Sequence, residues 1–274
     1  MKYSLHAIAV SVFVSSVSFA ATNAFYFAQI TDTHYGRPMH NYRFTNAVDR
    51  INNLPFKLEV VAHTGDFASD NFERNVDAIT NLFAMITAAP LIVVPGNHDI
   101  SYRGSDAKKR FAECIRVYRG HVGELGTVTE TENAFYITVC TEGLYNDFEG
   151  VTDFDPIGFV KGALAANKDG KPAFVFTHRP DGDDFYNNEH HASRMTNRDE
   201  WRKTLADGGA TAVIAGHFHR EELQDDAYGV PVYVAGPIAN YWGRQGSFRV
   251  YYYRDGKLSY HTVYIEDPAE SMEE

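Results

Sequence analysis

Short apolar runs alternate with polar or amphipathic segments along most of the chain. Compact runs rich in Val, Ile, Phe and Ala are typical of buried strands. They predict strands at Phe25–Ile30, Leu58–Ala62, Leu91–Val94, Ala134–Val139, Ala173–Phe176, Ala212–Ala215 and Val232–Ala235. Strands that alternate with helices along a chain indicate an α/β protein.

Between these strands, apolar residues recur at helical spacing. The clearest helix is predicted from about Asn71 to Thr87, where Asp70 can cap the first turn and Glu73 follows three residues later. Its apolar face consists of Phe72, Val76, Ile79, Leu82, Phe83 and Ile86. Further helices are predicted near Arg43–Asn53, Ala107–Arg119, Pro156–Asn167 and Arg198–Ala206.

Towards the C-terminal end the pattern changes to a hairpin, because Phe248–Tyr253 and Leu258–Tyr264 flank Asp255–Gly256. No change in composition marks a linker, so residues 25–265 are predicted to form a single domain. Parallel βαβ units followed by an antiparallel hairpin favour a layered sandwich with sheet inside and helices outside. The acidic tail, residues 266–274, is expected to be loose.

The N-terminal residues resemble an export signal. Lys2 is followed by Leu5–Phe19, which has no charge, and Ser18 and Ala20 fit the small-x-small rule for cleavage. We expect residues 1–20 to be removed, with cleavage as late as 24 as a second option, and the protein to be periplasmic or secreted. A membrane anchor is the alternative, but the stretch is shorter than the roughly 20 apolar residues of a spanning helix. No span is expected after cleavage.

Composition and charge narrow the possible partners. The 274 residues are 44% hydrophobic and 22% charged, as in ordinary globular proteins. The formal net charge is −11, and no cluster of Lys and Arg is present. A nucleic-acid polymer is therefore not expected as a partner, whereas a single nucleotide is compatible with this charge. The sequence gives no signal for the oligomeric state.

The two cysteines, Cys114 and Cys140, can form one disulfide or remain two buried thiols. Neither belongs to a CxxC pair, which gives little support to a redox site or a thiolate-bound zinc.

Five short polar segments follow predicted strands, where ligands gather in α/β proteins. They are Asp32-Thr33-His34, Gly65-Asp66, Gly96-Asn97-His98-Asp99, His178 and Gly216-His217-Phe218-His219. If the extended conformation persists, Asp32 and His34 point to the same side and can grip one cation. Singly, each segment is more often a turn or a structural histidine. Together they form an oxygen and nitrogen ligand set that suits Mn, Fe, Zn or Co.

The order D-x-H, G-D, G-N-H-D, H and G-H-x-H resembles the calcineurin-like metallophosphoesterase family. The resemblance spans Asp32 to His219, with no motif position missing. It implies a four-layer αββα sandwich with two mixed β-sheets and two divalent metal ions at the sheet edge. It also implies hydrolysis of a small phosphate mono- or diester by a metal-bridging hydroxide.

The resemblance also implies a role for each motif residue. One metal would be held by Asp32, His34, Asp66 and His219, and the other by Asp66, Asn97, His178 and His217. His98 would protonate the leaving group or stabilise the transition state, with Asp99 positioning it; a capping or packing role is the alternative for His98. The purple acid phosphatase branch carries Tyr three residues after its G-D aspartate. Ser69 stands there instead, so a tyrosinate–iron site is not expected.

Several residues near these motifs are candidate substrate contacts. Arg37, Arg103 and Arg179 can bind a phosphate bidentately, although exposed loop arginines are more often only solvated. Tyr35, Tyr102, Tyr186 and Trp242 can form an aromatic wall for a base or lipid-like leaving group, or serve as packing residues. The segment Asp181 to His191 is a candidate lid.

A function from another class is a non-catalytic metal-binding scaffold or interaction protein on the same fold. Such proteins usually have eroded ligand sets, whereas every ligand position is filled here. A serine hydrolase is disfavoured because the chain has no G-x-S-x-G elbow.

Overall fold

The computed structural model describes residues 24–69, 72–100, 107–145, 152–182, 195–224 and 228–268. The predicted export signal therefore lies outside the described residues, except for the alternative cleavage position at Ala24. No helix within these ranges is long and apolar enough to cross a membrane.

The first sheet has the strand order β11-β10-β1-β2-β3. Its strands are β1 (Phe25–Ile30), β2 (Leu58–His63), β3 (Leu91–Val93), β10 (Ser247–Arg254) and β11 (Lys257–Tyr264). The first three run parallel, while β10 is antiparallel to β1 and to β11. The predicted hairpin turn at Asp255–Gly256 is present, and both its residues have positive φ.

The second sheet has the order β4-β5-β6-β7-β9-β8. It contains β4 (Gly126–Glu130), β5 (Phe135–Val139), β6 (Ala173–Phe176), β7 (Ala212–Ala215), β8 (Glu222–Gln224) and β9 (Val232–Val234). Strands β5, β6, β7 and β9 are parallel, and the two edge strands are antiparallel to their neighbours.

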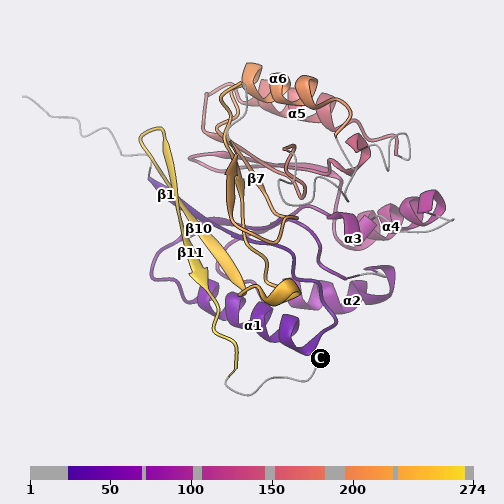
Figure 1. Cartoon of the computed structure of the whole chain (residues 1–274). Helices are drawn as coiled ribbons and strands as arrows, with labels where there is room; N and C mark the ends of the chain where they lie inside the picture. Colours follow the sequence, from indigo (N-terminus) through magenta and orange to yellow (C-terminus); the bar gives the residue numbers. More distant parts are fainter. Residues whose placement is uncertain are drawn as a thin grey trace, which may run out of the picture.

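Helices cover the outer face of each sheet (Figure 1). Figure 1 shows α1 (Pro38–Asn52) and α2 (Phe72–Phe83) on one side and α5 (Pro156–Ala166) and α6 (Arg198–Asp207) on the other. The short α3 (Asn97–Ile100) leads into α4 (Ala107–His121), which packs beside α2. This confirms the expected four-layer sandwich with two mixed sheets.

The core follows from the two-residue period of the strands. Phe174 and Phe176 of β6 point into the cluster between the sheets, where they meet Phe27 of β1. Ala173 and Val175, one residue out of phase, belong to the cluster beneath α5 and α6. Each central strand thus has two buried faces, which is why these strands appear as continuous apolar runs.

Helix boundaries differ from the predictions where polar residues are buried. Helix α1 starts at Pro38, five residues earlier than predicted, because Pro is well suited to the first helical turn. Its first turns bury His40 and Arg43, which an apolar pattern does not reveal. Helix α2 ends at Phe83, and Ile86 reaches the core from the turn that follows. The predicted cap, Asp70, lies outside the described residues.

The structure also describes the start of the acidic tail and the state of the two cysteines. Arg43 donates to both oxygens of Asp267 at 2.6 Å, which links the start of the acidic tail to α1. Residues 269–274 lie outside the described ranges. Cys114 and Cys140 are both buried free thiols.

Candidate metal centre

The predicted ligands come together where the parallel strands of both sheets end. Asp32 and His34 follow β1, Asp66 follows β2 and Asn97 follows β3, while His178 follows β6 and His217 and His219 follow β7. Two groups of side chains have ligand atoms within 4.8 Å of one another: Asp32, His34, Asp66 and His219, and Asp66, His178 and His217. Asp66 belongs to both groups, so it is placed to bridge two ions.

The first group brings four nitrogen and oxygen atoms, one from each residue, close together. His34 Nε2 lies 3.1 Å from His219 Nε2, which in turn lies 3.1 Å from Asp32 Oδ1. Asp66 Oδ2 is 3.6 Å from His34 Nε2. Within the described part of the chain, the buried Asp32 Oδ1 accepts no hydrogen bond.

In the second group, His178 Nε2 is the central atom. It lies 3.3 Å from Asp66 Oδ2 and 3.1 Å from Asn97 Oδ1, and the His217 ring centre is 5.1 Å from that of His178. Asn97 therefore joins this group, as the resemblance implied, with a neutral oxygen.

Both groups fit divalent metal ions. Ligand atoms about 2.1 Å from one ion, at octahedral or tetrahedral angles, are about 3.0–3.4 Å from each other, which is the spacing seen here. Two imidazole nitrogens facing each other at 3.1 Å also need a proton or a cation between them. Imidazole, carboxylate and amide donors without thiolate suit Mn, Fe, Zn or Co.

The backbone at these ligands is not extended, contrary to our expectation for the D-x-H segment. Seven residues other than glycine have positive φ in the described ranges, and five of them are ligands: Asp32, His34, Asp66, His217 and His219. The side chains therefore converge through left-handed turns after each strand rather than through the two-residue period of a strand. Residues in this conformation are strained and concentrate at functional sites.

Glycines let the ligand loops approach one another closely. A Cβ atom on Gly96 would lie 2.2 Å from Asp66 Oδ1, and one on Gly65 would lie 2.6 Å from His178 Nδ1. A Cβ atom on Gly216 would lie 2.0 Å from Thr31 Oγ1. The glycines that precede three of the five ligand segments are therefore required by contact with another ligand loop.

Hydrogen bonds from neighbouring residues and from another ligand loop hold the ligands in place. Thr31 Oγ1 and the His217 amide donate to Asp32 Oδ2 at 2.7 and 3.0 Å. His40 Nδ1 donates to the His34 carbonyl at 2.9 Å, since a carbonyl can only accept. Sequence reasoning assigned no role to His40, whose only signal is its position six residues after His34.

Burial and charge set the protonation of the ligands. Burial lowers the pKa of His34 to about 3, and burial together with Arg179 lowers the pKa of His217 well below its usual value. Both are therefore neutral, which is the ligand form of histidine. Burial opposes the charge of Asp32, yet its attraction to His219 lowers its pKa below the usual range. Burial likewise opposes protonation of His178, but Asp66 raises its pKa to about 10.

His98 is next to the ligands without belonging to either group. Its backbone N–H donates to Asp66 Oδ1 at 2.9 Å, and its Nδ1 donates to the Ser69 carbonyl at 2.5 Å. The hydrogen bond to Ser69 places the proton of the neutral ring on Nδ1 and the lone pair on Nε2.

The carboxylate of Asp99, which we expect to position His98, accepts hydrogen bonds from three backbone amides. Its Oδ1 accepts from the amides of Phe67 and Ala68, and its Oδ2 accepts from the amide of Gly96. Asp99 therefore joins the loop that carries Asp66 to the loop that carries Asn97 and His98.

The candidate substrate contacts differ in exposure. Arg37 is exposed, and its guanidinium carbon lies 5.2 Å from the ring centre of Tyr241. Arg179 is buried, with Nε 3.0 Å from Glu142 Oε2 and its guanidinium over the Tyr145 ring. Tyr35 is half-buried, and its amide donates to the Phe67 carbonyl. Arg103 lies outside the described residues.

The lid and the aromatic wall are only partly described. Tyr102, Tyr186 and residues 183–191 lie outside the described ranges, while Asp181 at the start of that segment pairs with Arg202 at 2.6 Å. Trp242 is 77% exposed and its ring centre is 5.1 Å from that of His219. Tyr241, which sequence reasoning overlooked, stacks on His219 at 5.5 Å, and its hydroxyl lies 3.0 Å from Ser69 Oγ.

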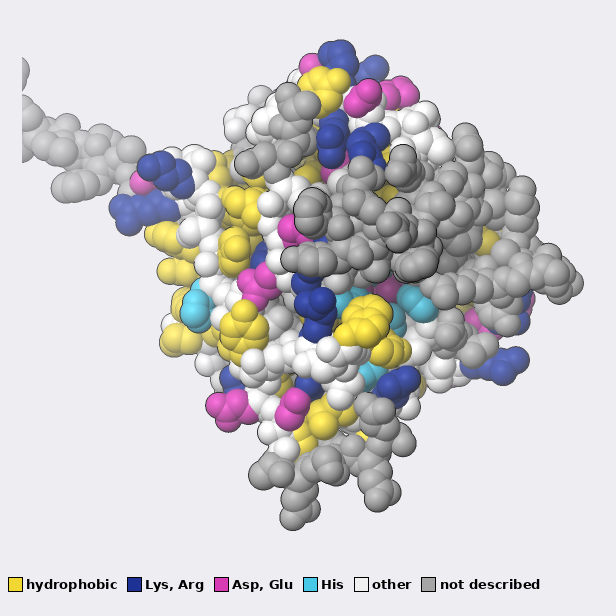
Figure 2. Space-filling view, in the orientation of Figure 1, with side chains coloured by type: hydrophobic (Ala, Val, Ile, Leu, Met, Phe, Trp, Pro, Cys, Tyr) yellow, Lys and Arg dark blue, Asp and Glu magenta, His cyan; other side chains and the backbone are white. Residues whose placement is uncertain are grey.

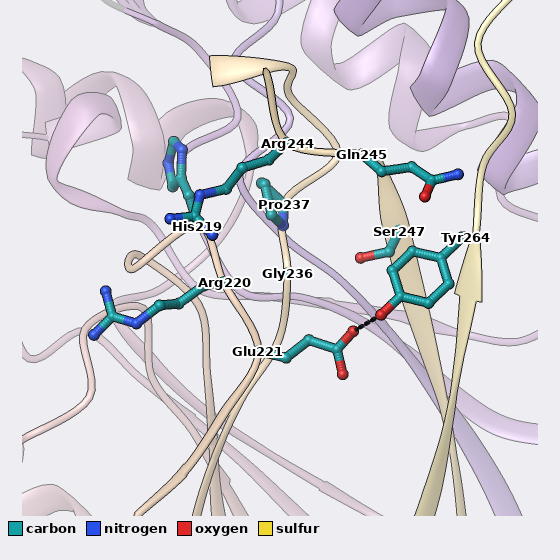
Figure 3. A pocket seen from close by; sticks show the side chains of 9 residues that line it. All are labelled: His219, Arg220, Glu221, Gly236, Pro237, Arg244, Gln245, Ser247 and Tyr264. Carbon is teal, nitrogen blue, oxygen red and sulfur yellow. Dashed lines mark hydrogen bonds between the residues drawn. The ribbon is translucent and has the colours of Figure 1, made fainter. Parts of the chain in front are cut away.

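A pocket of about 680 Å³ borders the first ligand group at His219. Its wall also includes Arg220, Glu221, Arg244, Gln245 and Tyr264, and Figure 3 shows Arg244 extending towards His219. Figure 2 shows histidines beside hydrophobic and basic side chains near the middle of the drawn face. The ligand groups are thus next to a polar pocket that carries the cationic side chains of Arg220 and Arg244.

Solved structures with the same fold include two phosphatases. A purple acid phosphatase from yellow lupin (Lupinus luteus) seeds is 16% identical with a TM-score of 0.65; the match covers 86% of this chain and 51% of that one, so the chain spans about half the lupin protein's length. A dimetal phosphatase from Danio rerio is 12% identical with a TM-score of 0.60, over 88% of this chain and 98% of that one.

A third structure with this fold is GAP50, described as the anchor in the inner membrane complex of Plasmodium. It is 12% identical with a TM-score of 0.59, over 88% of this chain and 84% of that one. At these identities the likeness shows a shared fold alone. The sequence has no significant match among curated proteins.

The family assignment rests on the sequence itself. The model of the calcineurin-like phosphoesterase family matches residues 25–221, which include all seven predicted ligands together with His98. This is more than half of the chain, and the matched part carries both ligand groups. The chain belongs to the calcineurin-like phosphoesterase family.

Proposed function

We propose that this protein is an exported two-metal phosphoesterase that hydrolyses a small phosphate mono- or diester. The observation that carries the proposal is the pair of ligand groups that share Asp66 at the ends of the parallel strands. Two divalent cations, when bound, supply positive charge for the phosphoryl oxygens and lower the pKa of a water between them.

The side chains of the chain prepare this site for an anionic substrate. Asp32 and Asp66 return two negative charges against the four of two divalent ions, and Asn97 adds an oxygen without adding charge. A locally positive site can therefore exist in a protein whose formal net charge is −11.

His98 is the proposed general acid. Its Nδ1–H is held by the Ser69 carbonyl, which orients the ring, and its backbone N–H is held by Asp66. Once protonated, Nε2 can deliver a proton to the leaving-group oxygen, which becomes more basic as its bond to phosphorus breaks.

The charge of the molecule supports a small substrate. A polymer of phosphates would meet an acidic surface without a cluster of Lys and Arg to replace its counterions. A small ester needs only the local charge of the metal centre and the neighbouring Arg220 and Arg244.

The test is hydrolysis by the mature protein reconstituted with manganese, using p-nitrophenyl phosphate and its bis ester. Faster hydrolysis of the bis ester supports a phosphodiesterase, and faster hydrolysis of the monoester supports a phosphatase. Protein that binds two metal ions but hydrolyses neither ester contradicts the proposal.

The second candidate is a non-catalytic scaffold, because one protein with this fold is described as an anchor. The complete ligand set and the oriented His98 favour the enzyme. The scaffold requires the same manganese-loaded protein to show no turnover across a broad panel of phosphate esters.

Export into the periplasm or out of the cell is supported by the uncharged Leu5–Phe19 stretch and the small residues Ser18 and Ala20. The mass of the protein recovered from the periplasm or medium tests this. A mature N-terminus at residue 21 or 25 supports export, whereas an intact N-terminus in the cytoplasm contradicts it.

A further inference from the structure

Trp242 stands out because two of its properties are individually unfavourable for a surface residue. Its side chain is 77% exposed although it is the largest apolar type. Its backbone is left-handed, with φ 57° and ψ 30°, which a bulky residue adopts only at a cost. The other residues of this kind in the described ranges are five metal ligands and the hairpin residue Asp255.

The contacts of Tyr241 fix the position of the neighbouring Trp242. Its ring stacks on His219 and meets the edges of His34 and His40 at 4.8 and 5.1 Å, while its hydroxyl is paired with Ser69. The next residue, Trp242, is therefore held beside the first ligand group, with its ring centre 5.1 Å from that of His219.

The pocket is lined by His219, the ligand that Trp242 contacts, and its wall indicates what a substrate at this site would meet. Glu221, Gln245, Ser247 and the two arginines give its wall donors and acceptors, and Arg244 is exposed only two residues after Trp242. Glu221 accepts from Tyr264 and Arg220 pairs with Glu222, so the wall is a polar surface already ordered within the protein. Such a surface suits the sugar and phosphate of a nucleotide better than an acyl chain, and the indole offers a flat apolar face on which a base can stack.

We propose that Trp242 is a stacking platform for the nucleobase of the substrate, so that the enzyme favours nucleotides and nucleotide esters. The inference rests on the proposed phosphoesterase function and names the substrate class of that site. The phosphoryl group would lie at the metal centre, with the base stacked on Trp242 beside His219.

The first test compares substrates that differ only by the base: adenosine 5′-monophosphate and ribose 5-phosphate. We expect kcat/KM to be about tenfold higher for the nucleotide, the effect of about 1.4 kcal/mol of stacking. If the enzyme prefers diesters, the pair is thymidine 5′-(p-nitrophenyl phosphate) and methyl p-nitrophenyl phosphate. Equal rates within a pair overturn the inference.

The variant Trp242→Ala isolates the ring, because alanine keeps the Cβ atom and its penalty at positive φ. It should lower kcat/KM for the nucleotide about tenfold and leave ribose 5-phosphate within twofold, and Trp242→Phe should fall between. Val128→Ala, which trims an exposed side chain on the distant edge strand β4, is the matched control. An equal loss on both substrates, or no loss, contradicts the platform.

A binding measurement separates this inference from the proposed function. The chain has two tryptophans, and Trp201 is buried at 1% exposure, so changes in indole emission on adding nucleotide report on Trp242. In the His98→Ala background, adenosine 5′-monophosphate should quench this emission and ribose 5-phosphate should not. Quenching by the nucleotide without turnover of any ester by the wild type would contradict the proposed phosphoesterase function but support stacking on Trp242. Turnover without quenching would support the phosphoesterase function and contradict stacking on Trp242.

Discussion

Among single residues, Asp66 connects the most parts of the site. Its carboxylate faces His34 and His178, one from each ligand group, and accepts the backbone N–H of His98. No other side chain in the described ranges belongs to both groups. Loss of its charge would therefore weaken the binding of both metal ions at once.

Asp66→Asn is expected to lower activity at least about 100-fold and to reduce metal content, because one bridging negative charge is removed. Metal analysis and the p-nitrophenyl ester assay measure both effects. Asp255→Asn makes the same change at another residue with positive φ, in the exposed hairpin turn, and should behave as the wild type. Full metal content and rate in Asp66→Asn would exclude a bridging role.

His98→Ala is expected to keep both metal ions and to lower kcat by about 10²–10⁴-fold, because it removes a proton donor and no ligand. Steady-state kinetics on metal-loaded protein measure this, with His121→Ala at the exposed end of α4 as the control. Loss of the metals from His98→Ala would show instead that the ring holds the site together.

Metal affinity is expected to increase with pH. Asp66 raises the pKa of His178 to about 10, so at pH 7 this imidazole is protonated before metal binds, and the neutral form that binds metal becomes more populated as the pH rises. Between pH 6 and 8 this group alone predicts about a tenfold gain in affinity per unit. Calorimetry in buffers with different ionisation enthalpies should detect one released proton; none would show that His178 is already neutral.

The sequence identifies the metal ligands but not the residues that hold them in place. The ligands follow strands as polar residues at short spacings, which a reader of the sequence can recognise. His40 donates from a ring nitrogen to the His34 carbonyl, and the Tyr241 ring stacks on His219. Both contacts form only when the chain folds. Asp99 was recognised by its motif, yet its partners are backbone amides that no motif specifies.

Between the elements, the loops that follow β2, β3 and β6 touch directly through glycines. Gly96→Ala would place a methyl group 2.2 Å from Asp66 Oδ1 and should displace that carboxylate, so metal content and activity should fall together. Gly162→Ala in α5 meets no atom within 4 Å and should instead stabilise the fold by about 0.5–1 kcal/mol. Metal analysis with thermal unfolding distinguishes the two, and a Gly96→Ala protein with full metal content would contradict the close contact.

The elements that sequence reasoning identified are those with two buried faces. Central strands such as β6 and β7 are fully buried and therefore apolar throughout. Edge strands β4 and β8 were not predicted because their residues are half-buried or exposed and include Thr, Glu and Gln. Backbone pairing rather than side-chain burial makes them strands, and pairing leaves no pattern in the sequence.

For the molecule as a whole, the contact between β1 and β10 joins the two ends of the fold. Tyr251 of β10 stacks on Phe27 of β1 with ring centres 4.8 Å apart, and its hydroxyl donates to Gln29 Oε1 at 2.8 Å. Tyr251→Ala should lower the free energy of unfolding by about 3–5 kcal/mol, whereas Tyr251→Phe, the matched control, should cost only about 1 kcal/mol. Denaturant unfolding measures both; equal effects would show that the ring contributes little.

That same pairing has a consequence for when and where the metal is acquired. Phe25 of β1 lies opposite Tyr253 of β10, so β1 has both of its neighbouring strands only after β10 has been synthesised. Contacts between such distant parts of a chain form slowly. Asp32 and His34 follow β1, so the ligand group to which they belong is complete only after β10 has paired with that strand. If the chain is exported before this pairing forms, the metal ions of the destination compartment would fill the site.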